Sequence, residues 1–182
     1  MGMPMGVGIV AASGVFLAAG AVGLYGTFVP QSSLWCRNTW HGPRAGDRVA
    51  LTFDDGPSPG YTDRVLEILA RQRVPASFFV IGRNVEKSPN LLRRVHDAGH
   101  LVGNHTFDHH HFAVFRGYRY WLDQLERTSN IVERTIGQRP RYFRPPVGIK
   151  FIFTAMAARR LGQTVVTWSQ SARDGVATSV DR

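Results

Sequence analysis

Thr52-Phe53-Asp54-Asp55-Gly56-Pro57 follows the apolar run Val49-Ala50-Leu51 and is the most informative stretch of this sequence. A short apolar run that ends in turn residues is typical of a buried strand, so two adjacent carboxylates stand where the strand ends. Two imidazoles, His105 and His109, stand four residues apart further along the chain. One aspartate and two histidines commonly hold a catalytic divalent metal that keeps open coordination positions. A second aspartate beside the ligand is suited to deprotonate the attacking water, so the pattern predicts a metal-assisted hydrolase.

Each half of this pattern has an ordinary alternative. Asp-Gly-Pro after a strand is common turn sequence, and a histidine pair at this spacing is more often solvated than bound to a metal. His110 and His111 are rival ligands because they adjoin His109. We prefer His109, since the i, i+4 spacing places it beside His105 if the segment is helical.

The composition fits one globular domain with a short extra segment. The chain has 182 residues and a net charge of +9, from 22 Lys and Arg against 13 Asp and Glu. The cations are dispersed rather than gathered in one basic tract, which argues against nucleic acid as a partner. We interpret the excess as a solvated surface that favours acidic polymers or anionic lipid headgroups. Cys36 is the only cysteine in the sequence, so no intrachain disulfide forms.

Residues 1–30 have the pattern of a membrane segment. Met5 to Pro30 carries no charged residue and is long enough to cross a hydrocarbon core about 30 Å thick. A cleaved secretory signal is the alternative, with Ala18-Ala19-Gly20-Ala21 as its cleavage zone. No Lys or Arg precedes the apolar run, and the run continues past that zone to Val29, so we favour an uncleaved transmembrane anchor. Residues 31–46 are expected to form a polar linker.

Beyond the linker, strand patterns alternate with helix patterns. The expected strands are 48–53, 76–81, 101–102, 142–143 and 164–168, and the expected helices are 62–73, 89–98, 118–136 and 151–161. This alternation predicts an α/β fold with a parallel sheet, either open or closed into a barrel. Sites in such folds form at the carboxyl ends of the strands. The candidate site residues all follow expected strands: Asp54, Asp55, His105, Arg144 and Asp174.

Four segments of the sequence resemble the polysaccharide deacetylase family, the NodB homology domain of carbohydrate esterase family four. Residues 52–57 resemble the first family motif, residues 104–109 the second and residues 142–148 the third, and residues 168–175 resemble a weakened fourth. The similarity begins at about Arg48, so we assign residues 47–182 to a partial catalytic domain. The resemblance implies a distorted (β/α) barrel of the NodB type.

The resemblance also implies a metal and a base. Asp55, His105 and His109 would bind Zn²⁺, with Co²⁺, Ni²⁺ or Mn²⁺ as alternatives. Asp54 would be the base. The backbone N–H of Val147 would help to hold the oxyanion.

Arg144 would orient and tune the base Asp54, with Asp174 behind it. A neighbouring cation keeps a base carboxylate ionised, so this role is chemically sensible apart from the family. The alternative is that Arg144 is a structural salt-bridge partner. For Trp168 we favour packing inside the domain over a place in a sugar-stacking groove.

Two departures from the family pattern matter. Asp174 is followed by Gly175, where the family usually has Trp. The chain also stops at Arg182, before the family's fifth motif, a Leu-x-His whose histidine provides the catalytic acid. We therefore expect a fragment of a longer protein, with a barrel that is incomplete at its C-terminus and an exposed edge beside residues 164–168. His96 and His100 are poor substitutes for the acid, because one lies in an expected helix and the other precedes a strand, whereas His110 and His111 adjoin the metal ligand and are weak candidates.

Taken together, these features predict a metal-dependent hydrolase that removes acetyl groups from N-acetylated or O-acetylated glycans such as peptidoglycan or chitin-like polymers. The alternatives are a non-catalytic glycan-binding remnant and a small-molecule metal-dependent amidohydrolase. The expected partners are the glycan and, through the N-terminal helix, a membrane. Arginines that follow the apolar segment favour a cytoplasmic domain by the positive-inside rule. Access to a wall polymer favours the opposite side, and we expect a membrane-anchored protein whose domain is extracytoplasmic.

Overall fold

The computed structural model describes residues 5–43, 48–110 and 113–172, with side chains from residue 16 onward. Six strands form one sheet in the order β1-β6-β5-β4-β3-β2, and every pair of neighbours is parallel. The strands are β1 (Asn38–Thr39), β2 (Thr52–Gly56), β3 (Ser77–Val80), β4 (Leu101–Asn104), β5 (Tyr142–Phe143) and β6 (Thr164–Val166). The predicted α/β fold with a parallel sheet is therefore confirmed.

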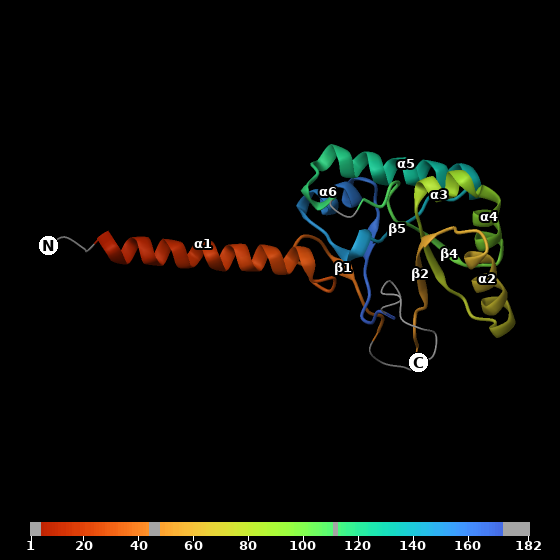
Figure 1. Cartoon of the computed structure of the whole chain (residues 1–182), viewed down its shortest axis with the longest axis horizontal. Coiled ribbons are helices and arrows are strands. Elements are labelled where there is room, and N and C mark those ends of the chain that lie inside the picture. Colours follow the sequence, from red (N-terminus) through yellow and green to blue (C-terminus); the bar gives the residue numbers. More distant parts are fainter. Residues whose placement is uncertain (1–4, 44–47, 111–112, 173–182) are drawn as a thin grey trace.

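Helices connect the strands and cover the sheet (Figure 1). They are α2 (Tyr61–Gln72), α3 (Gly82–Lys87), α4 (Pro89–Asp97), α5 (Tyr118–Ile136) and α6 (Ile152–Arg160), with single 3₁₀ turns η1 (Ala113–Phe115) and η2 (Pro146–Gly148). The bounds of α5 are those predicted from the sequence. The short helix α3 was not predicted, because six residues are too few to show a clear 3.6-residue period.

The longest helix of the domain, α5, owes its position to one buried stripe. Trp121, Leu125, Thr128 and Val132 recur every three or four residues, and each is at most 2% exposed. This spacing places them on a single face of the helix, which packs against the sheet and its neighbours. Gly137 ends the helix in the left-handed region at φ 71°, and its N–H donates to Glu133 O.

The core divides into two clusters of apolar side chains. One lies among the first strands and helices, and its fully buried members include Val85, Leu92 and Val132. The other contains Trp121 and Phe143, and joins α5 to α6 and to the last strands. Because α5 contributes Val132 to one cluster and Trp121 and Leu125 to the other, it joins the two parts of the core.

The described sheet is open, and its open edges are not where the prediction placed one. Strands β2 to β6 are neighbours in chain order, as in the wall of a barrel, but over the described residues β1 and β2 form two open edges. The prediction of an exposed edge beside residues 164–168 is wrong, because β1 pairs with β6 there through Asn38–Val165 and Thr39–Val166. Part of the stretch predicted as a linker is thus a strand of the sheet.

The first active-site strand is also displaced relative to the prediction. It was expected at 48–53, but β2 covers Thr52–Gly56 and so includes both aspartates. Its pairing with β3 shifts register between Phe53 and Gly56, and Asp55 has φ 67°. A bulge of this kind redirects a side chain at a strand end, and here it lies at Asp55.

The N-terminal segment forms the expected helix, α1 (Met5–Phe28), which extends away from the sheet (Figure 1). Among the described residues, however, no helix has the length and apolarity that a membrane crossing needs, so the predicted transmembrane anchor is not supported. The C-terminal end of α1 instead packs on the domain. Thr27 is 6% exposed, its Oγ1 accepts a hydrogen bond from Trp35 Nε1, and its carbonyl accepts one from the Lys150 N–H. This end of the predicted anchor is therefore buried against protein.

Candidate metal centre

Three of the predicted ligands converge at the carboxyl ends of β2 and β4. Asp55 Oδ1 lies 3.4 Å from His105 Nε2 and 3.2 Å from His109 Nε2. The three ligand atoms all lie within 4.8 Å of one another. One carboxylate oxygen and two imidazole nitrogens are a donor set that suits a divalent transition metal. The Asp55 side chain is 61% exposed, so the site is open to solvent on one side.

The protonation state of His105 suits a ligand. The ring is 2% exposed, and burial, together with the nearby His109, lowers the pKa of His105 to about 4. Its Nδ1 lies 2.7 Å from the carbonyl oxygen of Arg144, a distance at which a protonated Nδ1 donates a hydrogen bond. A carbonyl partner of this kind fixes the tautomer, which leaves the Nε2 lone pair directed at Asp55.

The segment from His105 to His109 is a tight loop and not a helix. Thr106 has φ 67° and His109 has φ 53°, and the His109 N–H donates to Thr106 Oγ1 at 3.1 Å. The preference for His109 holds, but the helical reason for it was wrong. His110 does not belong to the cluster of ligand atoms in the described residues, and His111 lies outside them.

Asp54 and Arg144 form an ion pair beside the triad. Arg144 is 3% exposed, and its Nη1 donates to Asp54 Oδ1 at 2.8 Å and to Thr52 Oγ1 at 2.8 Å. Its Nη2 donates to Thr167 O at 3.2 Å. Burial lowers the pKa of Arg144, while Asp54 opposes that shift. The guanidinium also lies 4.1 Å from the centre of the Phe79 ring, so it is held by contacts on several sides.

The third motif forms an exposed turn next to this pair. Val147 is 52% exposed and has φ 56°, a strained conformation for a β-branched residue. Gly148 follows at φ 71°, where an added Cβ would meet Trp168 Cη2 at 2.8 Å. Trp168 is half-buried, and its ring lies 5.6 Å from the Arg144 guanidinium, in keeping with the packing role predicted for it. The remaining predicted site residue, Asp174, lies outside the described residues.

Two residues that the sequence analysis missed hold the ligand loops. Asn84, at the start of α3, donates from Nδ2 to Asp55 O at 2.8 Å. Gln124, on α5, accepts the N–H groups of Phe107 and Asp108. A polar residue next to the apolar stripe of α5 is a detectable signal for Gln124. The sequence carries no comparable signal for Asn84, since α3 itself was not predicted.

Two of the histidines considered as acids lie elsewhere. The His100 ring accepts a hydrogen bond from the Ala76 N–H at its Nδ1, at the amino ends of β3 and β4. His96 belongs to α4. Because the metal centre lies at the carboxyl ends of the same strands, neither residue contributes to it.

Comparison with known proteins assigns this geometry to a family. A family model described as "Polysaccharide deacetylase" matches residues 41–166. A peptidoglycan-N-acetylglucosamine deacetylase of Bacillus cereus is 36% identical over 140 residues, which cover 77% of this chain and 50% of the relative. A chitooligosaccharide deacetylase of a Bradyrhizobium species is 38% identical over 143 residues, which cover 78% of this chain and 65% of the relative.

The fold agrees with solved structures of the same family. The crystal structure of BA3943, a family-four carbohydrate esterase pseudoenzyme from Bacillus anthracis, superposes with a TM-score of 0.69 at 28% identity. The match covers 73% of this chain and 47% of that one. The chain spans only part of the length of the curated relatives it matches, from 27% to 66%. On the match over residues 41–166, this chain belongs to the polysaccharide deacetylase family.

Proposed function

We propose that this chain is the catalytic part of a metal-dependent deacetylase that removes acetyl groups from N-acetylated glycans. Peptidoglycan and chitin-like polymers are the first candidate substrates, because relatives are deacetylases of peptidoglycan N-acetylglucosamine and of chitooligosaccharides. O-acetylated glycans are the second. The observation that carries the proposal is the Asp55-His105-His109 triad next to the Asp54–Arg144 ion pair.

The reaction is a hydrolysis in which each residue has a distinct task. Asp55, His105 and His109 would hold a divalent metal, Zn²⁺ first and Co²⁺, Ni²⁺ or Mn²⁺ as alternatives, which when bound would polarise the acetyl carbonyl and lower the pKa of water. Asp54 takes the proton of the attacking water, and Arg144 holds its carboxylate in place at 2.8 Å. The backbone N–H of Val147 donates to the acetyl oxygen as negative charge develops on it.

The Arg144 side chain supports the role predicted for Asp174. Its Nε is buried and has no hydrogen-bond partner among the described residues. A buried unpaired donor costs about 1–3 kcal/mol. We propose that Asp174 acts behind Arg144 in orienting it toward Asp54, the role that the family resemblance implies for it.

Metal content and acetate release test the proposal together. We expect one divalent ion per purified chain by elemental analysis, and loss of that ion in the double variant Asp55→Ala, His105→Ala. Equal metal content in the two proteins would contradict the metal centre. In a complete homologous protein, which has the catalytic acid, the variant equivalent to Asp54→Asn should keep the metal and lower the rate of acetate release from N-acetylglucosamine oligomers by about 10²–10⁴-fold, since a general base supplies that factor. Loss of the metal in Asp54→Asn would instead make Asp54 a ligand.

A second candidate is a glycan-binding module without catalysis. The leaving amine must be protonated, and neither His96 nor His100 lies at the site. The structural relative BA3943 is itself described as a pseudoenzyme. This candidate predicts that the chain binds N-acetylglucosamine oligomers without releasing acetate, whereas the first candidate requires acetate release.

We infer that the domain works outside the cytoplasm. The inference is supported by the substrate class, because a peptidoglycan or surface polymer is reached from that side. Protease digestion of intact cells whose outer layer has been permeabilised tests it. Cleavage of the domain is expected, and protection of the Arg182 end would favour a cytoplasmic location.

A further inference from the structure

One buried side chain of α5 holds the loop between the two histidine ligands. Gln124 is 2% exposed. Its Oε1 accepts the N–H of Phe107 at 3.1 Å and the N–H of Asp108 at 2.9 Å. Its Nε2 donates to Asp108 Oδ2 at 2.9 Å. All three hydrogen bonds go to the two residues that immediately precede His109.

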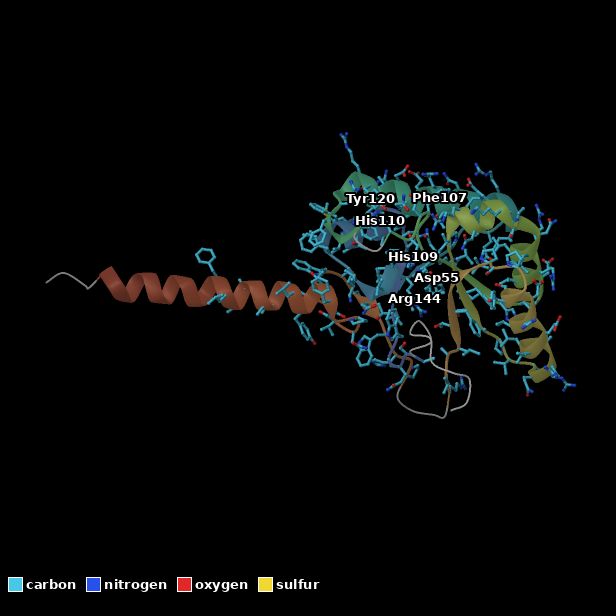
Figure 2. All side chains as sticks on the ribbon, in the orientation of Figure 1. Asp55, Phe107, His109, His110, Tyr120 and Arg144 are labelled. Carbon is cyan, nitrogen blue, oxygen red and sulfur yellow. The ribbon has the colours of Figure 1, made fainter. Side chains whose placement is uncertain are left out.

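The same loop is held from the opposite side by the first turn of α3. The Gly82 N–H donates to Thr106 O at 2.9 Å, and the Arg83 N–H donates to Phe107 O at 3.2 Å. The Phe107 peptide is therefore held at its N–H by α5 and at its C=O by α3. Figure 2 shows the place of Phe107 relative to His109. Because the N–H and the C=O of Phe107 are both held, the backbone that leads to His109 has a fixed direction, and His109 itself has φ 53°.

We propose that Gln124 is a positioning residue of the metal centre, which sets His109 Nε2 relative to His105 and Asp55 and so determines the affinity and geometry of the site. This inference rests on the proposed function, because it assumes that the triad binds a metal. Groups that orient metal ligands from behind typically contribute about 10–100-fold to metal affinity. Gln124 acts through the backbone N–H groups of Phe107 and Asp108 and through the Asp108 carboxylate.

An amide is suited to this position because it accepts and donates from one planar group. Replacement by leucine leaves the buried N–H of Phe107 and the partly buried N–H of Asp108 without this acceptor. Replacement by glutamate keeps the acceptor for both N–H groups, but it loses the donor to Asp108 and sets two carboxylates against each other. Changing Asp108 to asparagine at the same time returns a donor to the pair, with the hydrogen bond reversed.

The experiment measures metal binding without reference to catalysis. Zn²⁺ affinity is obtained by competition with a chromophoric chelator, and site geometry by the visible absorption of bound Co²⁺. Gln124→Leu should weaken Zn²⁺ binding by about 10–100-fold and alter the Co²⁺ spectrum. Gln124→Glu should also bind weakly. Gln124→Glu combined with Asp108→Asn should recover most of the affinity and the spectrum of the unmodified protein.

Val132→Ala is the matched control. Val132 is buried on the same helix at 0% exposure, but it packs in the core. This variant should lose stability and keep both the Zn²⁺ affinity and the Co²⁺ spectrum. If it loses affinity as Gln124→Leu does, general destabilisation explains the effect and the inference is wrong.

The remaining outcomes separate this inference from the proposed function. If the unmodified protein binds no Zn²⁺, the metal centre itself fails. If it binds Zn²⁺ and Gln124→Leu binds equally well, only the positioning role fails. If Gln124→Leu does not fold, the glutamate variants decide, and a double variant that binds no better than Gln124→Glu overturns the inference.

Discussion

Four of the five non-glycine residues with positive φ in the described chain lie in the loops around the metal centre: Asp55, Thr106, His109 and Val147. Each such conformation costs about 1–3 kcal/mol and persists where the surroundings enforce it. At Asp55 the carbonyl is held by Asn84, and at His109 the N–H is held by Thr106. The strained backbone conformations therefore occur at or next to residues that carry predicted ligand atoms and at Val147, whose N–H is the proposed oxyanion donor. A fixed geometry matters most at these residues.

Val147 provides a test of this strain. Val147→Gly should stabilise the fold by about 0.5–1 kcal/mol, because glycine adopts a positive φ without the Cβ clash. Glycine loses more backbone entropy than valine on folding, and this loss offsets only part of the gain. Acetate release should be kept, since the proposed donor is the backbone N–H and glycine retains it. Urea unfolding and an acetate assay measure the two effects.

Arg73→Gly is the control for Val147→Gly. Arg73 ends α2 at φ 54°, away from the metal centre, so glycine there should stabilise by a similar amount and leave activity unchanged. A Val147→Gly protein that is more stable but inactive would assign a function to the valine side chain.

His100 predicts a pH dependence of stability. Burial lowers the pKa of His100 below its ordinary value of 6.5, and its Nδ1 accepts the Ala76 N–H, so the folded state favours the neutral ring. The unfolded state therefore takes up the proton first as the pH falls. The contribution of neutral His100 to the free energy of unfolding is fully present above about pH 6.5. As the pH falls below that value, the contribution is lost by no more than about 1.4 kcal/mol per pH unit.

His100→Asn isolates this contribution, because its side-chain oxygen can accept the same N–H without titrating. The difference in free energy of unfolding between wild type and variant, measured from pH 8 to pH 5, should stay constant above about pH 6.5 and move in favour of the variant below it. A difference that stays constant over the whole range would contradict the assignment.

At the scale of elements, the segment after α1 is part of the domain. The carbonyl of Pro30 accepts hydrogen bonds from Asn38 Nδ2, Lys150 Nζ and Thr167 Oγ1 at 2.6, 2.8 and 2.8 Å. Lys150 is 0% exposed, and its Nζ also donates to Val29 O at 3.1 Å. Burial lowers the pKa of Lys150, but a cation near the carboxyl end of a helix is favourable. These bonds dock the end of α1 and the strand β1 onto the sheet.

Lys150→Met should therefore destabilise the domain by about 1–3 kcal/mol, because the Val29 carbonyl loses its buried partner. The Pro30–Asn38 segment should also become more sensitive to limited proteolysis. Lys87→Met, at an exposed lysine of α3, is the control and should change neither quantity. Unchanged stability in Lys150→Met would mean that the docking does not depend on the buried ammonium group.

At the scale of the whole molecule, the described sheet is open between β1 and β2. Strand β2 has a neighbour on one side only, and the apolar side chains of Val49 and Leu51 that precede it are 92% and 41% exposed. An open edge with exposed apolar side chains is a template for pairing with another chain. This edge also carries Asp54 and Asp55, so a second chain that pairs with it lies next to the metal centre.

The open edge predicts self-association that depends on concentration. Light scattering with size-exclusion chromatography should detect oligomers of the 182-residue chain at high concentration. Val49→Lys with Leu51→Lys should reduce them, since charged side chains protect sheet edges. Ile152→Lys, at an exposed position of α6 away from this edge, should leave the oligomers in place. Equal association in all three proteins would place the contact elsewhere.

Much of the architecture followed from local pattern. The stripe Trp121, Leu125, Thr128, Val132 predicted α5, and alternation of helices and strands predicted the parallel sheet. Both depend on burial periodicity, which a sequence displays directly. The ligand residues were also predicted, because chemistry that needs Asp and His at strand ends leaves few candidates.

Tertiary structure decided the features that depend on contacts between residues far apart in the sequence. The left-handed loop at Thr106 and His109 depends on Gln124 and on the first turn of α3, which lie far from it in the sequence. The docking of Pro30 depends on Lys150, 120 residues away, so local composition predicted a linker where a strand forms. The sequence by itself indicated Asp55, His105 and His109, which the structure brings together. Their geometry was decided by long-range hydrogen bonds to buried polar groups, because a buried donor or acceptor must find its partner wherever the fold brings one.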